Sequence, residues 1–163
     1  RSEHDEHSFA TYVYGSAEVV GLMCLRAFVA APDADGDPEA TYEELRPGAQ
    51  RLGAAFQKLN FLRDLGEDSR ELGRAYLGPV LDEDLKRTLT GEITEELDAA
   101  RTAIPLLPVA ARRGVAAAEA LFRELNSRIA ATPAAELQST RVSVPNHIKL
   151  ALTAKALANA RKQ

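Results

Sequence analysis

Four residues with oxygen-bearing side chains recur at helical spacing near the middle of the chain. Gln57, Asn60, Asp64 and Asp68 lie three or four positions apart, so on a helix they share one face. The two carboxylates would repel each other by roughly 0.2–0.5 kcal/mol on an isolated helix, and a divalent cation between them would remove that cost. Magnesium suits such a site because it binds one or two carboxylates and completes its shell with water and phosphate oxygens. The pattern therefore indicates either a magnesium site or a solvent-exposed acidic face.

The segment that carries these residues is predicted to be a helix. Its apolar residues recur with a helical period, and it contains no internal proline. Pro47 suits the first turn and Gly73 the end, so we expect a helix from about Pro47 to Leu72. If the acidic face is merely solvated, Arg63 and Glu67 would form an ordinary i,i+4 salt bridge on it.

Helical periodicity extends over most of the remaining chain, and no segment alternates as a strand would. Thr41 is expected to cap a short separate turn before the central helix. Further helices are expected at about 9–31, from Asp82 or Thr90 to the prolines at 105 and 108, at 109–130 and at 146–160. The predicted fold class is all-α, with residues 1–163 forming a single domain.

Two groups of side chains have a predicted environment. The acidic residues of the segment after Asp82 are expected to form a solvated face; they are Glu92, Glu95, Glu96 and Asp98. Cys24 follows Met23 in an apolar run and is expected to lie in the core. As the only cysteine it excludes an internal disulfide and fits a reducing, cytoplasmic location.

Composition excludes several classes of protein. Apolar residues make up 45% of the 163 residues and charged residues 27%, which is enough to build a core. The net charge is −4 with scattered Lys and Arg, so nucleic-acid binding has no electrostatic support. No stretch approaches the roughly 20 apolar residues of a transmembrane helix.

Two segments together resemble the squalene and phytoene synthase family. Residues 12–21, YVYGSAEVVG, resemble its segment Y-x-x-x-x-A-G-x-V-G. Residues 57–68, QKLNFLRDLGED, resemble its second aspartate-rich motif, Q-x-x-N-I-x-R-D-x-x-E-D, and residues 73–77, GRAYL, resemble the G-R-x-Y-L that follows. A weaker match joins residues 141–144, RVSV, and Lys149 to the family element R-V-x-V…K. The resemblance covers nearly the whole chain but only about the C-terminal half of a family member.

The resemblance implies a fold and a reaction. The fold would be the C-terminal part of the isoprenoid synthase barrel of helices, in which two aspartate-rich motifs face each other at the mouth of an apolar cavity. The reaction would be Mg²⁺-dependent head-to-head coupling of two prenyl diphosphates, with Mn²⁺ as an alternative metal. The runs GSAEVVGLMCLR and RDLGED are more similar to bacterial, actinobacterial-type phytoene synthases than to squalene synthases. We therefore expect two geranylgeranyl diphosphates to give phytoene through prephytoene diphosphate, as in carotenoid biosynthesis.

Two alternatives to this reading stay open. One is squalene or dehydrosqualene synthesis from farnesyl diphosphate, and squalene synthesis would also require NADPH. Another is a non-catalytic relative that acts as a helical scaffold or assembly partner. The resemblance also allows peripheral membrane association of a cytoplasmic protein for release of its apolar product.

The resemblance implies roles for the matched polar residues. Asp64 and Asp68 would bind the metal, and the chemistry suits this because a metal neutralises a departing diphosphate as a Lewis acid. Arginine gives permanently charged, bidentate contacts to phosphate. The residues expected to bind substrate at this end are Gln57, Asn60, Arg63, Arg74 and Arg141.

The segment at 12–21 would serve the reacting chain. Tyr12 matches the family tyrosine that shuttles the proton lost when the cyclopropane forms. A tyrosine with a pKa of about 10 is a poor base. A departing diphosphate could accept the proton instead. Ser16, Val20 and Gly21 would border the prenyl chain with small or apolar groups, and the same small face would also suit close helix packing.

Several positions depart from the family pattern. Glu18 stands where many members have glycine, so it would either add a charge near the cavity or face another helix. Phe122 stands where several members carry a diphosphate-binding tyrosine. The acidic i,i+4 pairs before the central helix, among them Asp33 with Asp37, lie in or next to the loop at 31–38 and not in a helix of the right kind, so the first D-x-x-x-D motif has no counterpart here. We therefore expect these residues alone to be inactive.

Overall fold

The computed structural model describes residues 14–32, 34, 36–71 and 81–159, with side chains at 14, 16, 66–71, 157 and 159 left aside. Helices account for most of these residues, and none of them forms a strand, which confirms the predicted all-α class. The elements are η1 (Tyr14–Glu18, a π-helix), α2 (Val19–Val29), α3 (Pro38–Glu71), α4 (Glu83–Ala103), η2 (Ile104–Leu106, a 3₁₀-helix), α5 (Val109–Ala131), α6 (Ala134–Leu137) and α7 (Asn146–Asn159).

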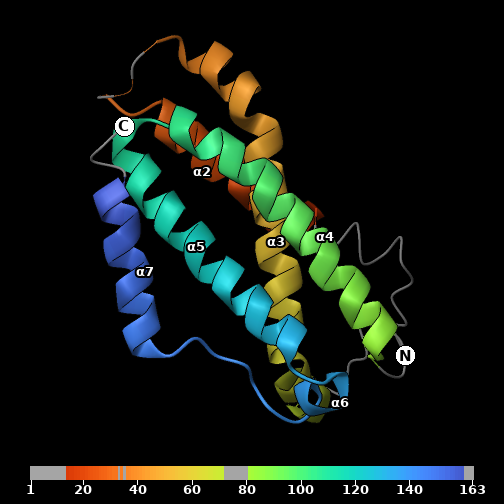
Figure 1. Cartoon of the computed structure of the whole chain (residues 1–163). Coiled ribbons are helices and arrows are strands. Elements are labelled where there is room, and N and C mark those ends of the chain that lie inside the picture. The colour runs from red at the N-terminus through yellow and green to blue at the C-terminus, as the bar shows by residue number, and fades with distance from the viewer. Residues whose placement is uncertain (1–13, 33, 35, 72–80, 160–163) are drawn as a thin grey trace.

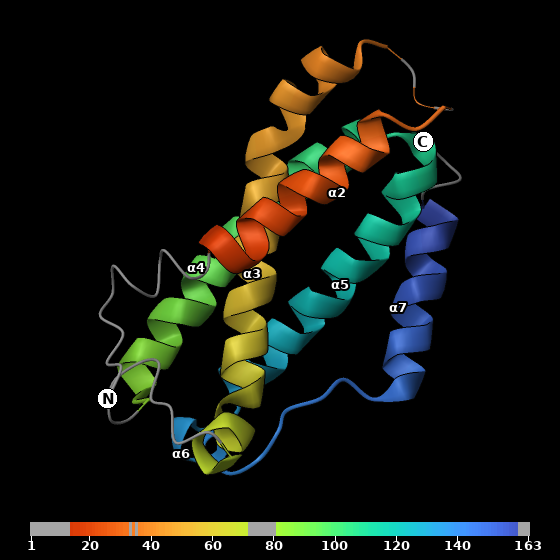
Figure 2. The same ribbon diagram turned by 180° about the vertical axis from the view of Figure 1, so that it is seen from behind.

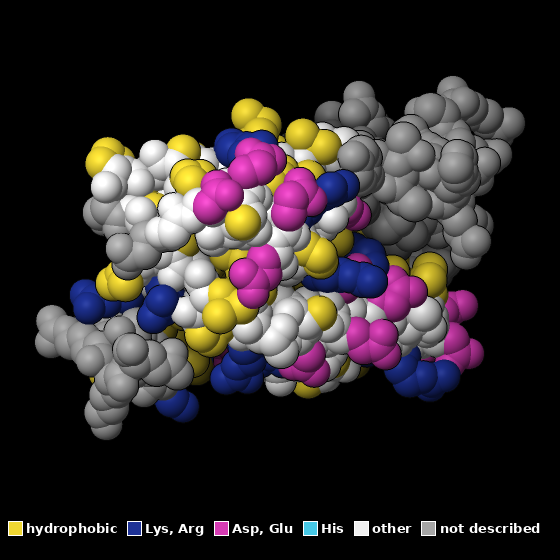
Figure 3. All heavy atoms as spheres, turned by 90° about the horizontal axis from the view of Figure 1, so that it is seen from above, with side chains coloured by type: hydrophobic (Ala, Val, Ile, Leu, Met, Phe, Trp, Pro, Cys, Tyr) yellow, Lys and Arg dark blue, Asp and Glu magenta, His cyan; other side chains and the backbone are white. Residues whose placement is uncertain are grey.

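Helix α3 is the centre of the arrangement. It lies between α2 on one side and α4 and α5 on the other, and α7 runs along the outside of α5 (Figures 1 and 2). At one end of the molecule, hydrophobic side chains alternate with acidic and basic ones, without a continuous field of either charge (Figure 3).

Helix α3 begins earlier than the sequence predicted. It runs without interruption from Pro38 through Pro47, so the expected separate turn at Thr41 and the expected start at Pro47 are both wrong. Asp37 begins the helix, because its side-chain Oδ1 accepts the Glu39 backbone N–H at 3.0 Å and its carbonyl accepts that of Thr41 at 3.0 Å. Proline inside a helix removes one hydrogen bond and kinks the chain. The first turns of α3, in orange, are accordingly inclined to the rest of the helix (Figures 1 and 2).

The other helices follow the sequence pattern closely. Asp82 is the N-cap of α4, since its Oδ1 accepts the Leu85 N–H at 2.8 Å, a contact typically worth about 1 kcal/mol. α5 and α7 agree with the expected ranges within a few residues. Leu125 and Ile129 of α5 are buried in a core cluster with residues of α3 and α4 that include Leu59, Leu62, Ile93 and Leu97. A second, smaller cluster joins α2 to the start of α3 and to Leu107, which directly follows η2; its buried members are Leu25, Val29, Leu45 and Leu107.

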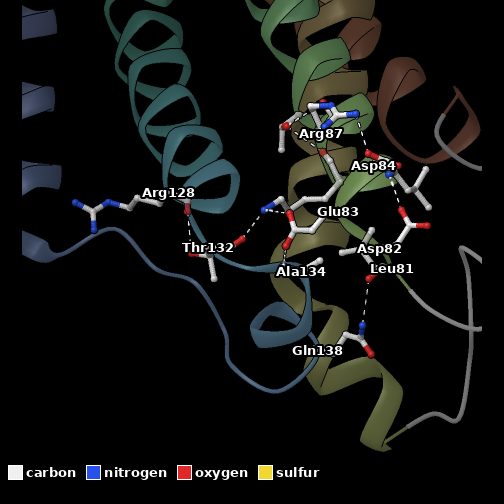
Figure 4. A network of polar contacts seen from close by, with 12 residues as sticks. Leu81, Asp82, Glu83, Asp84, Arg87, Arg128, Thr132, Ala134 and Gln138 are labelled. Atoms are coloured by element: carbon white, nitrogen blue, oxygen red, sulfur yellow. Dashed lines mark hydrogen bonds and ion pairs between the residues drawn. The ribbon is translucent and has the colours of Figure 1, made fainter.

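A polar network fixes the start of α4 against the end of α5 and α6 (Figure 4). The buried Lys86 donates to the Thr132 carbonyl at 2.7 Å and pairs with Glu83 at 2.7 Å. Glu83 in turn accepts the backbone N–H of Ala134 at 2.6 Å, and this hydrogen bond is the main reason that the pKa of Glu83 is lowered. Gln138 donates to the Leu81 carbonyl at 3.2 Å. The network therefore anchors the region from which residues 141–145 lead to α7.

One predicted environment in α4 is wrong. Glu92, Glu95 and Asp98 are exposed, as expected of a solvated face, but Glu96 is buried and its side chain is only 8% exposed. Lys58 of α3 binds both Glu92 and Glu96 at 2.8 Å. The partner lies on a different helix, so the acidic pattern of α4 by itself did not reveal the ion pair.

Candidate functional site

A largely apolar cavity of about 360 Å³ lies between α2, α3, the end of α4 and α5. This volume falls within the range of about 300–1,000 Å³ that is usual for ligand sites. On α3 its lining extends from Leu45 to Asn60, a helix length of about 22 Å at 1.5 Å per residue. The lining includes Val20, Gly21, Cys24 and Phe28 from α2, Leu52, Phe56, Gln57 and Asn60 from α3, and Val115 and Ala118 from α5.

Glycines let η1 and α2 approach α3 closely enough to form this wall. A Cβ on Gly21 would lie 2.6 Å from the Ala49 carbonyl oxygen, and a Cβ on Gly53 would lie 2.5 Å from the Ala17 carbonyl oxygen. Real Cβ atoms do not come so close to backbone oxygens, so each glycine is required by the helix crossing. Gly21 therefore serves both purposes considered from the sequence, close helix packing and a small cavity wall.

The residues predicted to border an apolar ligand are placed as follows. Val20 and Gly21 line the cavity. Ser16 lies within η1, but its side chain is outside the described part. Cys24 also lines the cavity and is exposed, so the prediction that it lies in the core is wrong. Because the cavity is open to solvent, a residue on its wall is accessible even though its neighbours are apolar.

Gln57 and Asn60 supply polar groups at one end of the α3 wall. Asp64 follows Asn60 by one turn of the same helix, about 6 Å further along its axis. The backbone of Asp68 lies in α3 one turn further still, and its side chain is outside the described part. The stripe of oxygen-bearing residues predicted from the spacing thus begins in the apolar cavity and continues beyond it.

The Asp64 carboxylate lies between two guanidinium groups. Arg63 binds it in a two-pronged manner, with Nε 2.9 Å from Oδ1 and Nη2 2.5 Å from Oδ2. Arg141, from the segment between α6 and α7, places its Nε 3.1 Å from Oδ1. These arginines lower the pKa of Asp64, mainly through the hydrogen bonds from Arg63 and with a smaller contribution from the charge of Arg141. Asp64 is consequently held as a carboxylate.

The structure therefore brings together three of the predicted site residues, Arg63, Asp64 and Arg141, and places Gln57 and Asn60 earlier on the same helix, in the cavity lining. Tyr12 and Arg74 lie outside the described residues, and their predicted roles in proton transfer and diphosphate binding stay predictions.

The donor chemistry at Asp64 fits magnesium or manganese. One carboxylate with neighbouring amide side chains is the kind of oxygen set that such ions accept together with water and phosphate oxygens. Among the described residues there is no group of three or more His, Cys, Asp or Glu side chains that could hold a metal. A metal at Asp64 would therefore need ligands from a bound diphosphate or from outside the described part.

Two sequence departures have structural explanations. Glu18 accepts a hydrogen bond from Gln50 of α3 at 3.3 Å, so it faces another helix and does not line the apolar cavity. Phe122 stacks on Phe56 with ring centroids 3.8 Å apart and planes inclined by 17°. Phe56 lines the cavity and Phe122 does not, so the Phe122 ring supports the cavity wall from behind.

The sequence reading missed Lys58, which fixes the orientation of α3. Its Nζ bridges Glu92 and Glu96 of α4, while its neighbour Gln57 lines the cavity. Burial raises the pKa of Glu96, and the hydrogen bonds from Lys58 oppose that effect. A signal was available, because Glu96 falls three residues after Ile93 and four before Ala100, on the apolar face of α4.

The fold and the site together define an all-α protein whose apolar cavity leads to a carboxylate flanked by arginines, an arrangement suited to a ligand with an apolar chain and a charged end. Residues 1–79 match the family model described as squalene/phytoene synthase, so this part of the chain is similar to that family.

Among the similar proteins are three plant phytoene synthases. The chain is 44% identical over 81 residues to the chloroplastic phytoene synthase 2 of Oryza sativa subsp. japonica, over 50% of this chain and 19% of that protein. Phytoene synthase 2 of Zea mays is 43% identical over 81 residues, with coverages of 50% and 18%. The enzyme of Narcissus pseudonarcissus is 37% identical over 92 residues, with coverages of 52% and 20%. The matched part thus spans about a fifth of the length of these relatives.

No helix among the described residues is both long and apolar enough to cross a membrane.

Proposed function

We propose that the protein takes part in head-to-head condensation of two prenyl diphosphates, with two geranylgeranyl diphosphates giving phytoene through prephytoene diphosphate. The observation that carries the proposal is the continuity of the α3 wall, from an apolar cavity through Gln57 and Asn60 to Asp64. The names of the curated relatives support a C20 substrate, because those proteins are phytoene synthases.

The apolar walls would hold the prenyl chain away from water. Burial of hydrocarbon contributes roughly 0.8 kcal/mol per CH₂, so transfer of a long prenyl chain from water into the cavity is strongly favourable. Side chains such as Val20, Phe56 and Ala118 offer no nucleophile that would quench an allylic cation. Exclusion of water serves the same end, because water would convert the cation to an alcohol.

The arginines would bind the diphosphate end. Guanidinium groups form bidentate, permanently charged contacts with phosphate oxygens, and Arg63 and Arg141 meet beside Asp64. Asp64, together with Asp68, would hold Mg²⁺ or Mn²⁺, with Gln57 and Asn60 nearby on the same helix face. The metal, when bound, would supply Lewis-acid stabilisation of the departing diphosphate.

The test is product identification with the protein expressed from its complete gene. It is incubated with farnesyl or geranylgeranyl diphosphate and Mg²⁺, with and without NADPH, and the hydrocarbon is analysed by mass spectrometry. Phytoene from the C20 substrate supports the proposal. Squalene or dehydrosqualene from the C15 substrate would replace the substrate assignment, and no hydrocarbon from either would favour a scaffold.

Asp64→Asn and Asp68→Asn are the informative variants for this assay. Each removes a carboxylate charge with little change in volume, so each is expected to abolish turnover while the protein stays folded. Asp98→Asn, at an exposed position of α4, is the matched control. Normal turnover in both site variants would contradict the metal assignment. For the 163 residues alone, which have no counterpart of the first aspartate motif, we expect ligand binding without coupling.

A further inference from the structure

A second cavity, of about 520 Å³, lies between α5, α7 and the end of α4. It uses a different face of α5 from the apolar cavity, because Ala116 and Ala120 line it whereas Val115 and Ala118 line the apolar cavity. Its volume is within the range that is usual for ligand sites. The short side chains of Ala116 and Ala120 leave room over this face of α5 for a small ligand.

Three basic side chains from three helices line this second cavity: Arg101, Arg112 and Lys155. Arg101 is in the last turn of α4, Arg112 is near the start of α5, and Lys155 is in the second half of α7. Because α5 runs antiparallel to both α4 and α7, these parts of the three helices lie at the same end of the molecule (Figure 1). The fold thus gathers three positive charges that are far apart in the sequence.

The other charged side chains of the lining have partners of their own. Arg123 pairs with Glu119 at 2.7 Å and with Asp98 at 2.8 Å. Glu124 pairs with Arg128 at 2.8 Å. Both carboxylates of the lining, Glu119 and Glu124, are therefore already neutralised by an arginine.

Arg101, Arg112 and Lys155 have no carboxylate partner in the part of the chain that the structure describes. Arg112 donates through Nε and Nη2 to the Leu107 carbonyl, at 3.2 and 3.0 Å, so its guanidinium is held at the cavity wall. Arg101 and Lys155 are exposed. Like charges that share a cavity repel one another, and an anion bound among them would replace that repulsion by attraction.

We propose that this second cavity is an accessory phosphate-binding site, in which Arg101, Arg112 and Lys155 together hold a phosphate or diphosphate group. Guanidinium groups bind phosphate oxygens in a bidentate, permanently charged manner, and the lysine ammonium adds a point charge. The net charge of −4 favours a small anion over a nucleic acid as the ligand. The site is separate from Asp64 and does not depend on the function proposed above.

Two sources carry this chemistry, a soluble phosphate compound and the headgroup of a phospholipid. Leu106 directly follows Pro105 of the cavity lining and is 55% exposed. Val109 is 58% exposed and precedes Arg112 by three residues, so both lie on one face of α5. Exposed apolar side chains beside a phosphate site suit a headgroup at a membrane surface, and the experiment has to separate this source from a soluble one.

The test measures binding of inorganic pyrophosphate by calorimetry, in the presence of EDTA, to the protein expressed from its complete gene. Arg101→Gln and Lys155→Gln are each expected to weaken binding about tenfold, the loss of one charge-assisted contact. Lys155→Arg keeps the charge and is expected to bind as the wild type does. A parallel assay measures cosedimentation with phosphatidylcholine vesicles, with and without phosphatidylglycerol.

Arg87→Gln is the matched control, because it removes the same charge from a side chain that is 78% exposed near the other end of α4. Thermal unfolding verifies that each variant is folded. Pyrophosphate binding that both cavity variants weaken supports a soluble ligand. Vesicle binding that requires phosphatidylglycerol and is weakened by both variants, without pyrophosphate binding, supports a headgroup.

Three results would overturn the accessory site. One is that the wild type binds neither pyrophosphate nor phosphatidylglycerol vesicles. Another is that Arg87→Gln weakens binding as much as Arg101→Gln does, since the effect would then come from net charge alone. The third is that Arg141→Gln abolishes pyrophosphate binding while the cavity variants bind normally, because the anion would then occupy only the site beside Asp64.

Discussion

At the scale of single residues, the candidate site depends on the charge of Asp64. Its pKa is lowered, chiefly by the hydrogen bonds from Arg63 and to a smaller degree by the charge of Arg141. A carboxyl group with a lowered pKa stabilises the folded state above its unfolded pKa of about 3.9, and that stabilisation is lost as the pH falls through the folded pKa. The site is therefore sensitive to acid and insensitive to pH near neutrality.

Arg63 and Arg141 are expected to lower the pKa of Asp64 by different amounts. Arg63→Gln is expected to raise the pKa of Asp64 more than Arg141→Gln does, because the Arg63 hydrogen bonds are the largest cause of the shift. Carboxyl ¹³C NMR titration measures both pKa values, and Arg26→Gln should leave the Asp64 titration unchanged. A larger shift in Arg141→Gln would contradict the geometry at Asp64. In Arg63→Gln, the part of the stability that Asp64 loses on acidification is expected to be smaller, because the folded and unfolded pKa values of this group lie closer together.

The sequence predicts which side chains share a helix face, because this depends only on their spacing. The stripe from Gln57 to Asp64 follows from the helical period, and α3 places Gln57 and Asn60 in the cavity lining and Asp64 one turn beyond them. The spacing did not establish that Arg141 would lie beside Asp64, because that contact depends on how the segment after α6 packs. The buried state of Glu96 was missed for a similar reason, since its partner Lys58 belongs to another helix.

At the scale of helices, the crossing of α2 and α3 determines the width of the cavity. Gly21→Ala would place a Cβ 2.6 Å from the Ala49 carbonyl oxygen of α3, and Gly53→Ala would place one 2.5 Å from the Ala17 carbonyl oxygen of η1, which leads directly into α2. Neither helix can relieve that contact by a change of rotamer, so the helices have to separate. We expect each variant to lose about 1–3 kcal/mol of unfolding free energy, the usual cost of overpacking, measured by urea denaturation.

Two other helical glycines provide the control for this prediction. Gly91 in α4 and Gly114 in α5 have nothing within 4 Å of an added Cβ. Alanine at either position is expected to be neutral or to stabilise the protein by up to about 1 kcal/mol, because alanine favours the helix over glycine. If all four substitutions had the same effect, helix propensity and not the crossing would explain the result.

The ion pair between α3 and α4 gives a second prediction at this scale. Lys58→Met would leave the buried Glu96 carboxylate without its cation, and we expect a loss of about 3 kcal/mol in unfolding free energy. The double variant Lys58→Met with Glu96→Leu replaces the pair by apolar groups and is expected to recover most of that loss. Lys149→Met, at an exposed position of α7, serves as the control. A double variant less stable than Lys58→Met would show that the pair does not act as a unit.

Helix boundaries illustrate what sequence signals can and cannot decide. Of the two starts considered for α4, Asp82 is correct and Thr90 is not; the Asp82 cap is a local interaction and so could be read from the sequence. Pro47 was a misleading start for α3. The turns before it bury Leu45 against Leu25 and Val29, and this packing favours continuation of the helix through the proline as a bend. Tertiary contacts thus overruled a local signal that was correctly identified.

At the scale of the whole molecule, the cavity is the feature that joins the separate helices into one site. Its walls come from α2, α3, α4 and α5, so no single segment of sequence could reveal its depth. The all-α class and most helices were predictable from periodicity, and the similarity to the squalene/phytoene synthase family from matched motifs. The discrimination between C15 and C20 chains depends instead on where the cavity ends.

Val115 lies at the end of the cavity opposite Asn60, because it packs against the cluster formed by Leu25, Val29, Leu45 and Leu107. Val115→Phe would fill that end and shorten the space for a prenyl chain. A farnesyl chain is five carbons shorter than a geranylgeranyl chain, so we expect binding of the C20 ligand to weaken about tenfold while the C15 ligand is little affected. Unreactive thiolodiphosphate analogues of both lengths allow affinity to be measured by calorimetry without turnover.

Val109→Phe is the control, because Val109 is 58% exposed and does not line the cavity; it should change neither affinity. Equal weakening of both ligands by Val115→Phe would mean that the prenyl chain does not reach this end of the cavity.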